Sequence, residues 1–183
     1  MKVIAIIPAR GGSKRLKKKN IYPIWGQPML SWAVKACKES RYHIVPWVST
    51  EDEEIAEAAR QCGAKVVMRD ASLADDKTYK QVAIRDAANK IEASEGPQDV
   101  YISLQANSPQ ISAKHLDEAI DSLLKYKRDE IFSVDEDLMQ NAAFRVFRGK
   151  YVFQQDLSTN CGVFICPIED VHTIEDVKRI ENG

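Results

Sequence analysis

Short apolar runs alternate along the chain with longer stretches in which apolar residues recur every three or four positions. The short runs predict β-strands at residues 3–7, 43–49, 64–68, 100–104, 130–134 and 163–166. The longer stretches predict α-helices at residues 28–37, 51–62, 78–93, 113–125 and 174–181. Strands separated by helices are typical of βαβ units, so the pattern predicts an α/β fold with a mostly parallel sheet.

Residues at the ends of these segments indicate where helices begin and where the chain turns. Thr50, Ser112 and Thr173 stand where their hydroxyls can cap the helices that follow. The segment from Phe144 to Phe153 is predicted to form a β-hairpin. No linker is rich enough in Gly, Pro or Ser to divide the chain, so residues 1–183 are interpreted as one domain.

Polar loops follow several of the predicted strands directly. Ligands in parallel α/β sheets bind beyond the carboxyl ends of the strands. This rule places residues 8–20, 49–50, 69–76 and 105–109 together at one edge of the sheet. We therefore expect the ligand site among these four loops.

The first of these loops carries the strongest chemical signal. Six of the eleven residues at positions 10–20 are Arg or Lys. Gly11 and Gly12 let the backbone approach a ligand closely, and N–H groups beside cations favour an anion such as a triphosphate. A solvated basic loop is the alternative and would explain Lys17 and Lys18, but not the paired glycines directly after a buried strand. The loop matches neither the Walker motif nor the Gly-x-Gly-x-x-Gly dinucleotide motif.

The composition excludes several classes of protein and partner. The 183 residues carry a net charge of −1, with 44% apolar and 29% charged residues, which is typical of a globular protein. Because the basic cluster is local, we expect no nucleic-acid partner. No apolar run approaches transmembrane length, so we expect no membrane association. The four cysteines form no Cys-x-x-Cys pair and are interpreted as free thiols of a cytoplasmic protein.

Residues 7–20 resemble the signature of the cytidylyltransferases that activate acidic sugars, such as the CMP-sialate and CMP-pseudaminate synthetases. That signature reads Pro-Ala-Arg-x-Gly-Ser-Lys-x-x-x-x-Lys-Asn. Its fixed positions are met here by Pro8, Ala9, Arg10, Gly12, Ser13, Lys14, Lys19 and Asn20. Similar segments continue to about residue 134, at positions 25–30, 48–56, 69–76 and 104–109.

The resemblance implies a Rossmann-like nucleotidyltransferase fold with three layers, α/β/α. It also implies transfer of CMP from CTP to an acidic sugar, such as a nonulosonic acid, with release of pyrophosphate. The implied nucleotide-binding residues are Ala9, Arg10, Gly11, Gly12, Ser13, Lys14, Lys19, Asn20, Arg69, Asp76 and Gln105. Three of them, Arg10, Lys14 and Lys19, are expected to be catalytic, because such transfer depends on positioning and on cations that neutralise developing charge.

The family holds Mg²⁺ through an Asp-x-Asp pair near its C-terminus. Asp170 matches the first Asp and is the expected metal ligand, whereas His172 stands at the second position. Imidazole suits softer metals than Mg²⁺. His172 is therefore interpreted as a polar residue ahead of the last helix, and Asp176 as an exposed acid within that helix.

Two further departures concern the sugar. The family often follows Ser-Pro with Leu-Arg, whereas this chain has Gln110 and Ile111, so the usual contact to the sugar carboxylate is missing. The segment at about 135–160 is shorter than the family's dimerisation and sugar-binding insertion, which predicts a more open sugar site or a different homodimer. Two alternatives stay open: a nucleotidyltransferase of this fold for another sugar, and a degenerate, non-catalytic nucleotide-binding protein.

Overall fold

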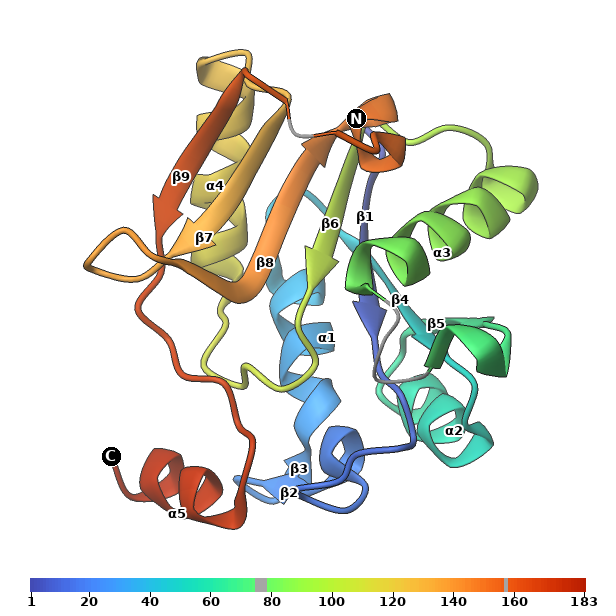
Figure 1. The fold of residues 1–183 in the computed structure, drawn as a ribbon, viewed down its shortest axis with the longest axis vertical. Coiled ribbons are helices and arrows are strands. Elements are labelled where there is room, and N and C mark those ends of the chain that lie inside the picture. The colour runs from blue at the N-terminus through green and yellow to red at the C-terminus, as the bar shows by residue number, and fades with distance from the viewer. Residues whose placement is uncertain (75–78, 157) are drawn as a thin grey trace.

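A central β-sheet organises the computed structural model, which describes residues 1–74, 79–156 and 158–183. Within these ranges seven strands pair in the order β5-β4-β1-β6-β8-β7-β9. Their bounds are Lys65–Met68, Val45–Thr50, Val3–Pro8, Val100–Leu104, Gln140–Arg148, Glu130–Val134 and Cys161–Ile165 in that order. Among these seven strands β8 alone pairs antiparallel, with β6 and β7. The predicted α/β fold with a mostly parallel sheet is confirmed (Figure 1).

Helices cover both faces of the sheet, because successive residues of its buried strands point to opposite sides. On β1, Val3, Ala5 and Ile7 pack into one apolar core, and Ile4 and Ile6 pack into another. The first core also takes side chains from α1 (Met29–Glu39), α2 (Glu53–Gln61) and α4 (Ala113–Lys125). The second core takes them from α3 (Lys80–Glu95). These are the three layers, α/β/α, that the family resemblance implies.

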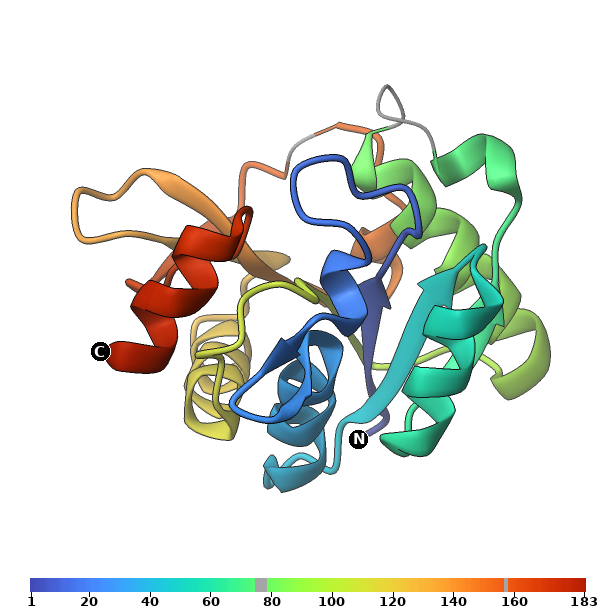
Figure 2. The ribbon, with the colours of Figure 1, turned by 90° about the horizontal axis from the view of Figure 1, so that it is seen from below.

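A third, smaller core joins the two ends of the chain. Leu16, in the loop after β1, packs with Val171, Val177 and Ile180, which belong to α5 (Ile174–Asn182) and the segment before it. The short strands β2 (Pro23–Ile24) and β3 (Gln27–Pro28) and the 3-10 helix η1 (Lys19–Ile21) complete the connection from this loop to α1. Figure 2 shows α5 lying beside this N-terminal region, away from the sheet.

The cap of α2 differs from the prediction. Asp52, not Thr50, is the N-cap, and its carboxylate accepts from the N–H groups of Glu54 (2.9 Å) and Ile55 (3.1 Å). Thr50 is the last residue of β4, is fully buried, and accepts a hydrogen bond from Asp52 N through Oγ1. The strand β4 therefore ends at Thr50, one residue later than expected. The helix then begins after Asp52, whose carboxylate supplies the cap.

The predicted hairpin at residues 144–153 is wrong. Residues from Gln140 to Arg148 form one strand, β8, and the chain then enters a 3-10 helix, η3 (Gly149–Phe153). Gly149 has a positive φ of 48° and its N–H donates to Asp99 O at 2.7 Å, which turns the chain away from the sheet. Buried Val152 then packs in the core that contains Tyr101.

Two short features complete the description. A 3-10 helix, η2 (Ala71–Ala74), follows β5. The start predicted for the third helix, residue 78, lies outside the described residues. No helix within the described ranges combines the length and apolarity needed to cross a membrane.

Candidate active site

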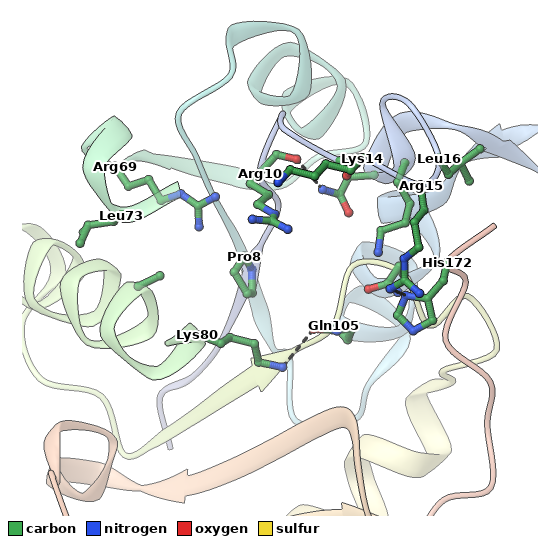
Figure 3. A pocket seen from close by; sticks show the side chains of 15 residues that line it. Pro8, Arg10, Lys14, Arg15, Leu16, Arg69, Leu73, Lys80, Gln105 and His172 are labelled. Atoms are coloured by element: carbon green, nitrogen blue, oxygen red, sulfur yellow. Dashed lines mark hydrogen bonds between the residues drawn. The ribbon is translucent and has the colours of Figure 1, made fainter. Parts of the chain in front are cut away.

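A cavity of about 540 Å³ opens at the carboxyl ends of β1, β5 and β6, where the sequence places the ligand site (Figure 3). Its walls come from the loop after β1, the segment after β5, the start of α3, the segment after β6 and the segment before α5. The expected nucleotide-binding residues in the walls are Arg10, Ser13, Lys14, Lys19, Asn20, Arg69 and Gln105. Asp76 lies outside the described residues.

The glycine pair in the first loop serves two different purposes. The N–H of Gly11 donates to Glu51 Oε1 at 2.7 Å, and a Cβ on Gly11 would lie 2.3 Å from Asp52 Oδ2. Gly11 is therefore required for close packing against the start of α2. A Cβ on Gly12 would meet no atom within 4 Å, so that position is open. Buried Ala9 donates its N–H to Ser49 O at 2.9 Å and anchors the loop to β4.

Asn20 closes the same loop. Its side chain is buried, and Nδ2 donates to Arg10 O at 2.9 Å. This bond ties the end of the loop to its beginning. The basic residues between them are thus carried on a loop with fixed ends.

Glu51 connects this loop to Arg69. The Arg69 guanidinium donates to Glu51 Oε2 through Nε (3.0 Å) and Nη2 (2.8 Å), with only 4% of the Arg69 side chain exposed. Because Glu51 Oε1 accepts from Gly11, one carboxylate fixes both the glycine loop and the arginine. Sequence reasoning assigned Glu51 only to a helix N-terminus. Its position directly after β4, on the same rim, was the signal that could have identified it.

Positive charge is concentrated around Lys19. Burial lowers the pKa of Lys19, the charge of Asp170 opposes that effect, and the charges of Arg15 and Arg10 add to it. The loop therefore holds several cations close enough to destabilise one another. A polyanion in the cavity would relieve this repulsion.

Asp170, the expected metal ligand, lies beside this cluster. Ser108 Oγ donates a hydrogen bond to one carboxylate oxygen, and the charge of Asp170 acts on both Lys19 and Lys80. No group of three or more His, Cys, Asp or Glu side chains in the described ranges is arranged to hold a metal. Mg²⁺ binds through one or two carboxylates when substrate phosphates and waters supply the other ligands. The residues present fit Mg²⁺ only in that form.

His172 lines the cavity, but its ring is already engaged. Nδ1 accepts a hydrogen bond from Arg15 Nη2 at 3.1 Å. Burial, followed by the charges of Lys19 and Arg15, lowers the pKa of His172, which favours the neutral imidazole that accepts this bond.

Asp176 is not the exposed acid that the sequence suggested. It caps α5, accepting from the N–H groups of His172 (2.8 Å) and Thr173 (2.9 Å), and 16% of its side chain is exposed. These bonds lower the pKa of Asp176 to about 2. With its carboxylate used in the cap, Asp176 does not replace the second metal-binding Asp.

Lys80 is a cavity residue that sequence reasoning missed. Its Nζ donates to Gln105 Oε1 at 3.0 Å and to Ala142 O at 3.3 Å. Burial lowers the pKa of Lys80 to about 8, opposed by the charge of Asp170. The available signal was a lysine at the first residue of a helix, where the helix dipole disfavours a cation.

Gln110 and Ile111 stand where the resembling family often carries Leu-Arg after Ser-Pro, so buried Ile111 takes the place of the arginine. Gln110 Oε1 accepts from Glu169 N at 3.1 Å. Gln110 therefore stabilises the segment that leads to Asp170, and it does not contribute to the cavity wall.

The arrangement as a whole can bind and orient a polyphosphate. The loop supplies Arg10, Lys14 and Lys19 as cations, while Arg69 and Gln105 lie on neighbouring walls. Preorganised cations of this kind stabilise charge that develops at phosphate oxygens during transfer.

Comparisons with known proteins agree with this chemistry. The family model described as Cytidylyltransferase matches residues 4–159. The chain is 37% identical to N-acylneuraminate cytidylyltransferase A of Danio rerio, over 72% of this chain and 30% of that protein. It is 31% identical to pseudaminic acid cytidylyltransferase of Campylobacter jejuni subsp. jejuni serotype O:23/36 (strain 81-176), over 74% of this chain and 59% of that protein. The chain thus spans less than two thirds of the length of either relative.

A solved structure supports the fold. CMP:2-keto-3-deoxy-manno-octonic acid synthetase complexed with CTP superposes with a TM-score of 0.82 at 16% identity, covering 100% of this chain and 98% of that one. At this identity the likeness establishes the fold.

Proposed function

The chain belongs to the cytidylyltransferase family, and we propose that it transfers CMP from CTP to an acidic sugar. The observation that carries the proposal is the cationic loop from Arg10 to Asn20, which forms one wall of a cavity at the carboxyl edge of the sheet. In the reaction, a sugar hydroxyl oxygen bonds to the α-phosphorus of CTP while the bond to the bridging oxygen breaks. Pyrophosphate leaves, and the hydroxyl proton passes to solvent.

The loop cations hold and neutralise the phosphates. Arg10, Lys14 and Lys19 line the cavity, and in this proposal they bind the triphosphate and stabilise the charge that grows on the leaving pyrophosphate. Gly12 leaves space for close approach of the phosphates to the backbone. Arg69 and Gln105 line other walls of the cavity, and we assign them to its nucleotide and sugar sides.

Asp170 would hold Mg²⁺ together with phosphate oxygens. The ion would supply further neutralisation of the triphosphate charge when bound. The hydrogen bond from Ser108 fixes the Asp170 carboxylate at the edge of the phosphate-binding region.

The acceptor that we favour is a nonulosonic acid. Relatives are named for N-acylneuraminate and pseudaminic acid, and the superposed structure for an octonic acid, so the shared chemistry is an acidic keto-sugar. Another acceptor on the same fold is the alternative. The histidine at position 172 favours a second candidate, a nucleotide-binding protein without turnover.

Further proposals concern the oligomeric state, the domain organisation and the location of the protein. We infer a homodimer, supported by apolar side chains exposed on the edge strand β9, Val163 and Ile165, and at the β7–β8 turn, Leu138 and Met139. We also infer that residues 1–183 form one catalytic domain. The free thiols of the four cysteines suit the reducing cytoplasm, which is the location that we infer.

Pyrophosphate release tests the proposal directly. The chain is incubated with CTP, Mg²⁺ and, in separate reactions, N-acetylneuraminate, pseudaminate and 3-deoxy-manno-octulosonate. We expect release with one acid at least, and a larger thermal stabilisation by CTP than by UTP, GTP or ATP. Stabilisation by CTP without turnover of any acid would favour the non-catalytic alternative. A preference for another nucleotide would contradict the assignment of CTP.

A further inference from the structure

A second cavity adjoins the first and shares one residue with it. It measures about 300 Å³ and is lined by Lys80, Gln140, Asn141, Ala142 and Arg145. Lys80 also lines the larger cavity. Figure 3 shows Lys80 reaching toward Gln105 at a distance from Arg10 and Lys14, so it lies apart from the phosphate-binding loop.

The two cations of the second cavity differ in their partners. Arg145 forms an ion pair with Glu130, whose side chain is 1% exposed, and its Nε donates to Glu130 Oε1 at 2.5 Å. Among the described residues, Lys80 donates to the neutral oxygens of Gln105 and Ala142, and Asp170 acts on it through its charge without forming a hydrogen bond to it. In the described ranges, no carboxylate oxygen lies within 4.0 Å of Lys80 Nζ, so Lys80 forms no ion pair there. A partly buried ammonium with neutral partners has a strong electrostatic preference for an incoming anion.

Gln105 is oriented by Lys80. An ammonium group can only donate, so the Gln105 atom that faces Lys80 Nζ is Oε1. The amide nitrogen of Gln105 is thereby left to donate to another group. Two donors from one wall, an ammonium and an amide, therefore lie at the junction of the two cavities.

We propose that Lys80 binds the carboxylate of the acidic acceptor and that Gln105 donates to a neighbouring acceptor oxygen. The assignment rests on the proposed function, because it requires the triphosphate to occupy the loop side of the larger cavity. Lys80 then acts as the specificity residue that distinguishes an acidic sugar from a neutral one. The cavity beyond it, toward β8, receives the remainder of the sugar.

Steady-state kinetics of Lys80→Met and Lys80→Arg test the assignment. Met keeps most of the length of the lysine side chain and removes the charge. We expect Lys80→Met to raise the KM for the acidic acceptor about 10- to 100-fold and to leave the KM for CTP within about twofold. Lys80→Arg should recover part of the loss. Lys114→Met, at an exposed lysine on α4, is the matched control and should change neither KM.

A binding measurement separates this proposal from the proposed function. Titrations with N-acetylneuraminate and with its neutral methyl ester are made in the presence of CTP, and the folding of each variant is checked by thermal unfolding. We expect the wild-type chain to prefer the acid and Lys80→Met to lose that preference. An unchanged preference in Lys80→Met, or equal loss of CTP and acid binding, would overturn the role of Lys80. Absence of turnover with this preference intact would overturn only the proposed function.

Discussion

His172 Nδ1 accepts a hydrogen bond from Arg15 Nη2 at 3.1 Å and so joins the loop after β1 to a segment 157 positions later in the chain. The contact places a guanidinium beside the position at which the resembling family has its second metal-binding carboxylate. It also explains how a histidine is accommodated there, since the ring acts as an acceptor for Arg15.

Replacing His172 with Asp tests this explanation. We expect His172→Asp to change the Mg²⁺-dependent rate by less than about threefold, because Arg15 would pair with the new carboxylate. The measurement is pyrophosphate release during a Mg²⁺ titration. A rate increase of tenfold or more, with tighter apparent Mg²⁺ binding, would show that the wild-type metal site is incomplete.

The contribution of the cavity-lining cations to kcat should be distinguishable from that of the exposed lysines in the same loop. Lys19→Met is expected to lower kcat about 10²- to 10³-fold, because Lys19 lines the cavity and stabilises developing charge. Lys17→Met removes an exposed lysine two positions earlier and should leave kcat within about twofold. Equal losses in the two variants would mean that the loop acts through its total charge alone.

Gly11 and Gly12 give a matched pair for stability. Gly11→Ala places a Cβ against Asp52 and is expected to reduce the free energy of unfolding by about 1–3 kcal/mol. At about 2–4 °C per kcal/mol, the loss should be visible as a lower Tm. Gly12→Ala has open space and should cost less than Gly11→Ala. Denaturant unfolding of both variants decides whether the packing against Asp52 is as close as described.

Lys80 should also leave a signature in the pH dependence of stability. Its pKa is lowered to about 8 from 10.5, with Asp170 and Arg145 as the charges that act on it. Below pH 8 the folded chain bears the full cost of burying the charged amine. Between pH 8 and 10.5 the folded state releases a proton that the unfolded state retains, so this cost is progressively removed.

The variant Lys80→Met lacks that cost at every pH. The Tm of the variant minus that of the wild-type chain should therefore be most positive near pH 7 and should fall between pH 8 and 10.5. Thermal unfolding at pH 7 and pH 9.5 measures the change. A difference that stays constant would mean that the pKa of Lys80 is not lowered in the folded chain, and a difference that grows with pH would mean that it is raised.

The parts of the fold set by local periodicity were predictable from sequence. The sequence identified β1, β6 and α4 with little error, because the two strands are short runs buried almost without a break and the buried positions of α4 recur at helical spacing. The segment at 144–153 was misread because β8 is buried on both faces, with Phe144 in one core and Phe147 in the other. Its end depends on the contact between Gly149 and Asp99, which lies far away in the sequence.

Some residues of the candidate site could likewise be predicted from the sequence, and others could not. The residues of the first loop were predictable because they are contiguous and form a specific motif. Glu51 and Lys80 were missed because each is an ordinary helix-end residue in its local context. Their importance arises only when Arg69, Gly11, Gln105 and Ala142 are brought beside them by the sheet.

The small core around Leu16, Val171, Val177 and Ile180 has a consequence for local unfolding. It holds α5 against the first loop without contributing to the two cores that flank the sheet. Opening of this core would release Asp170 and His172 from the cavity while the strands stay paired. Amide hydrogen exchange in α5 should therefore be faster than in β1 or β6, with an opening free energy below that of global unfolding.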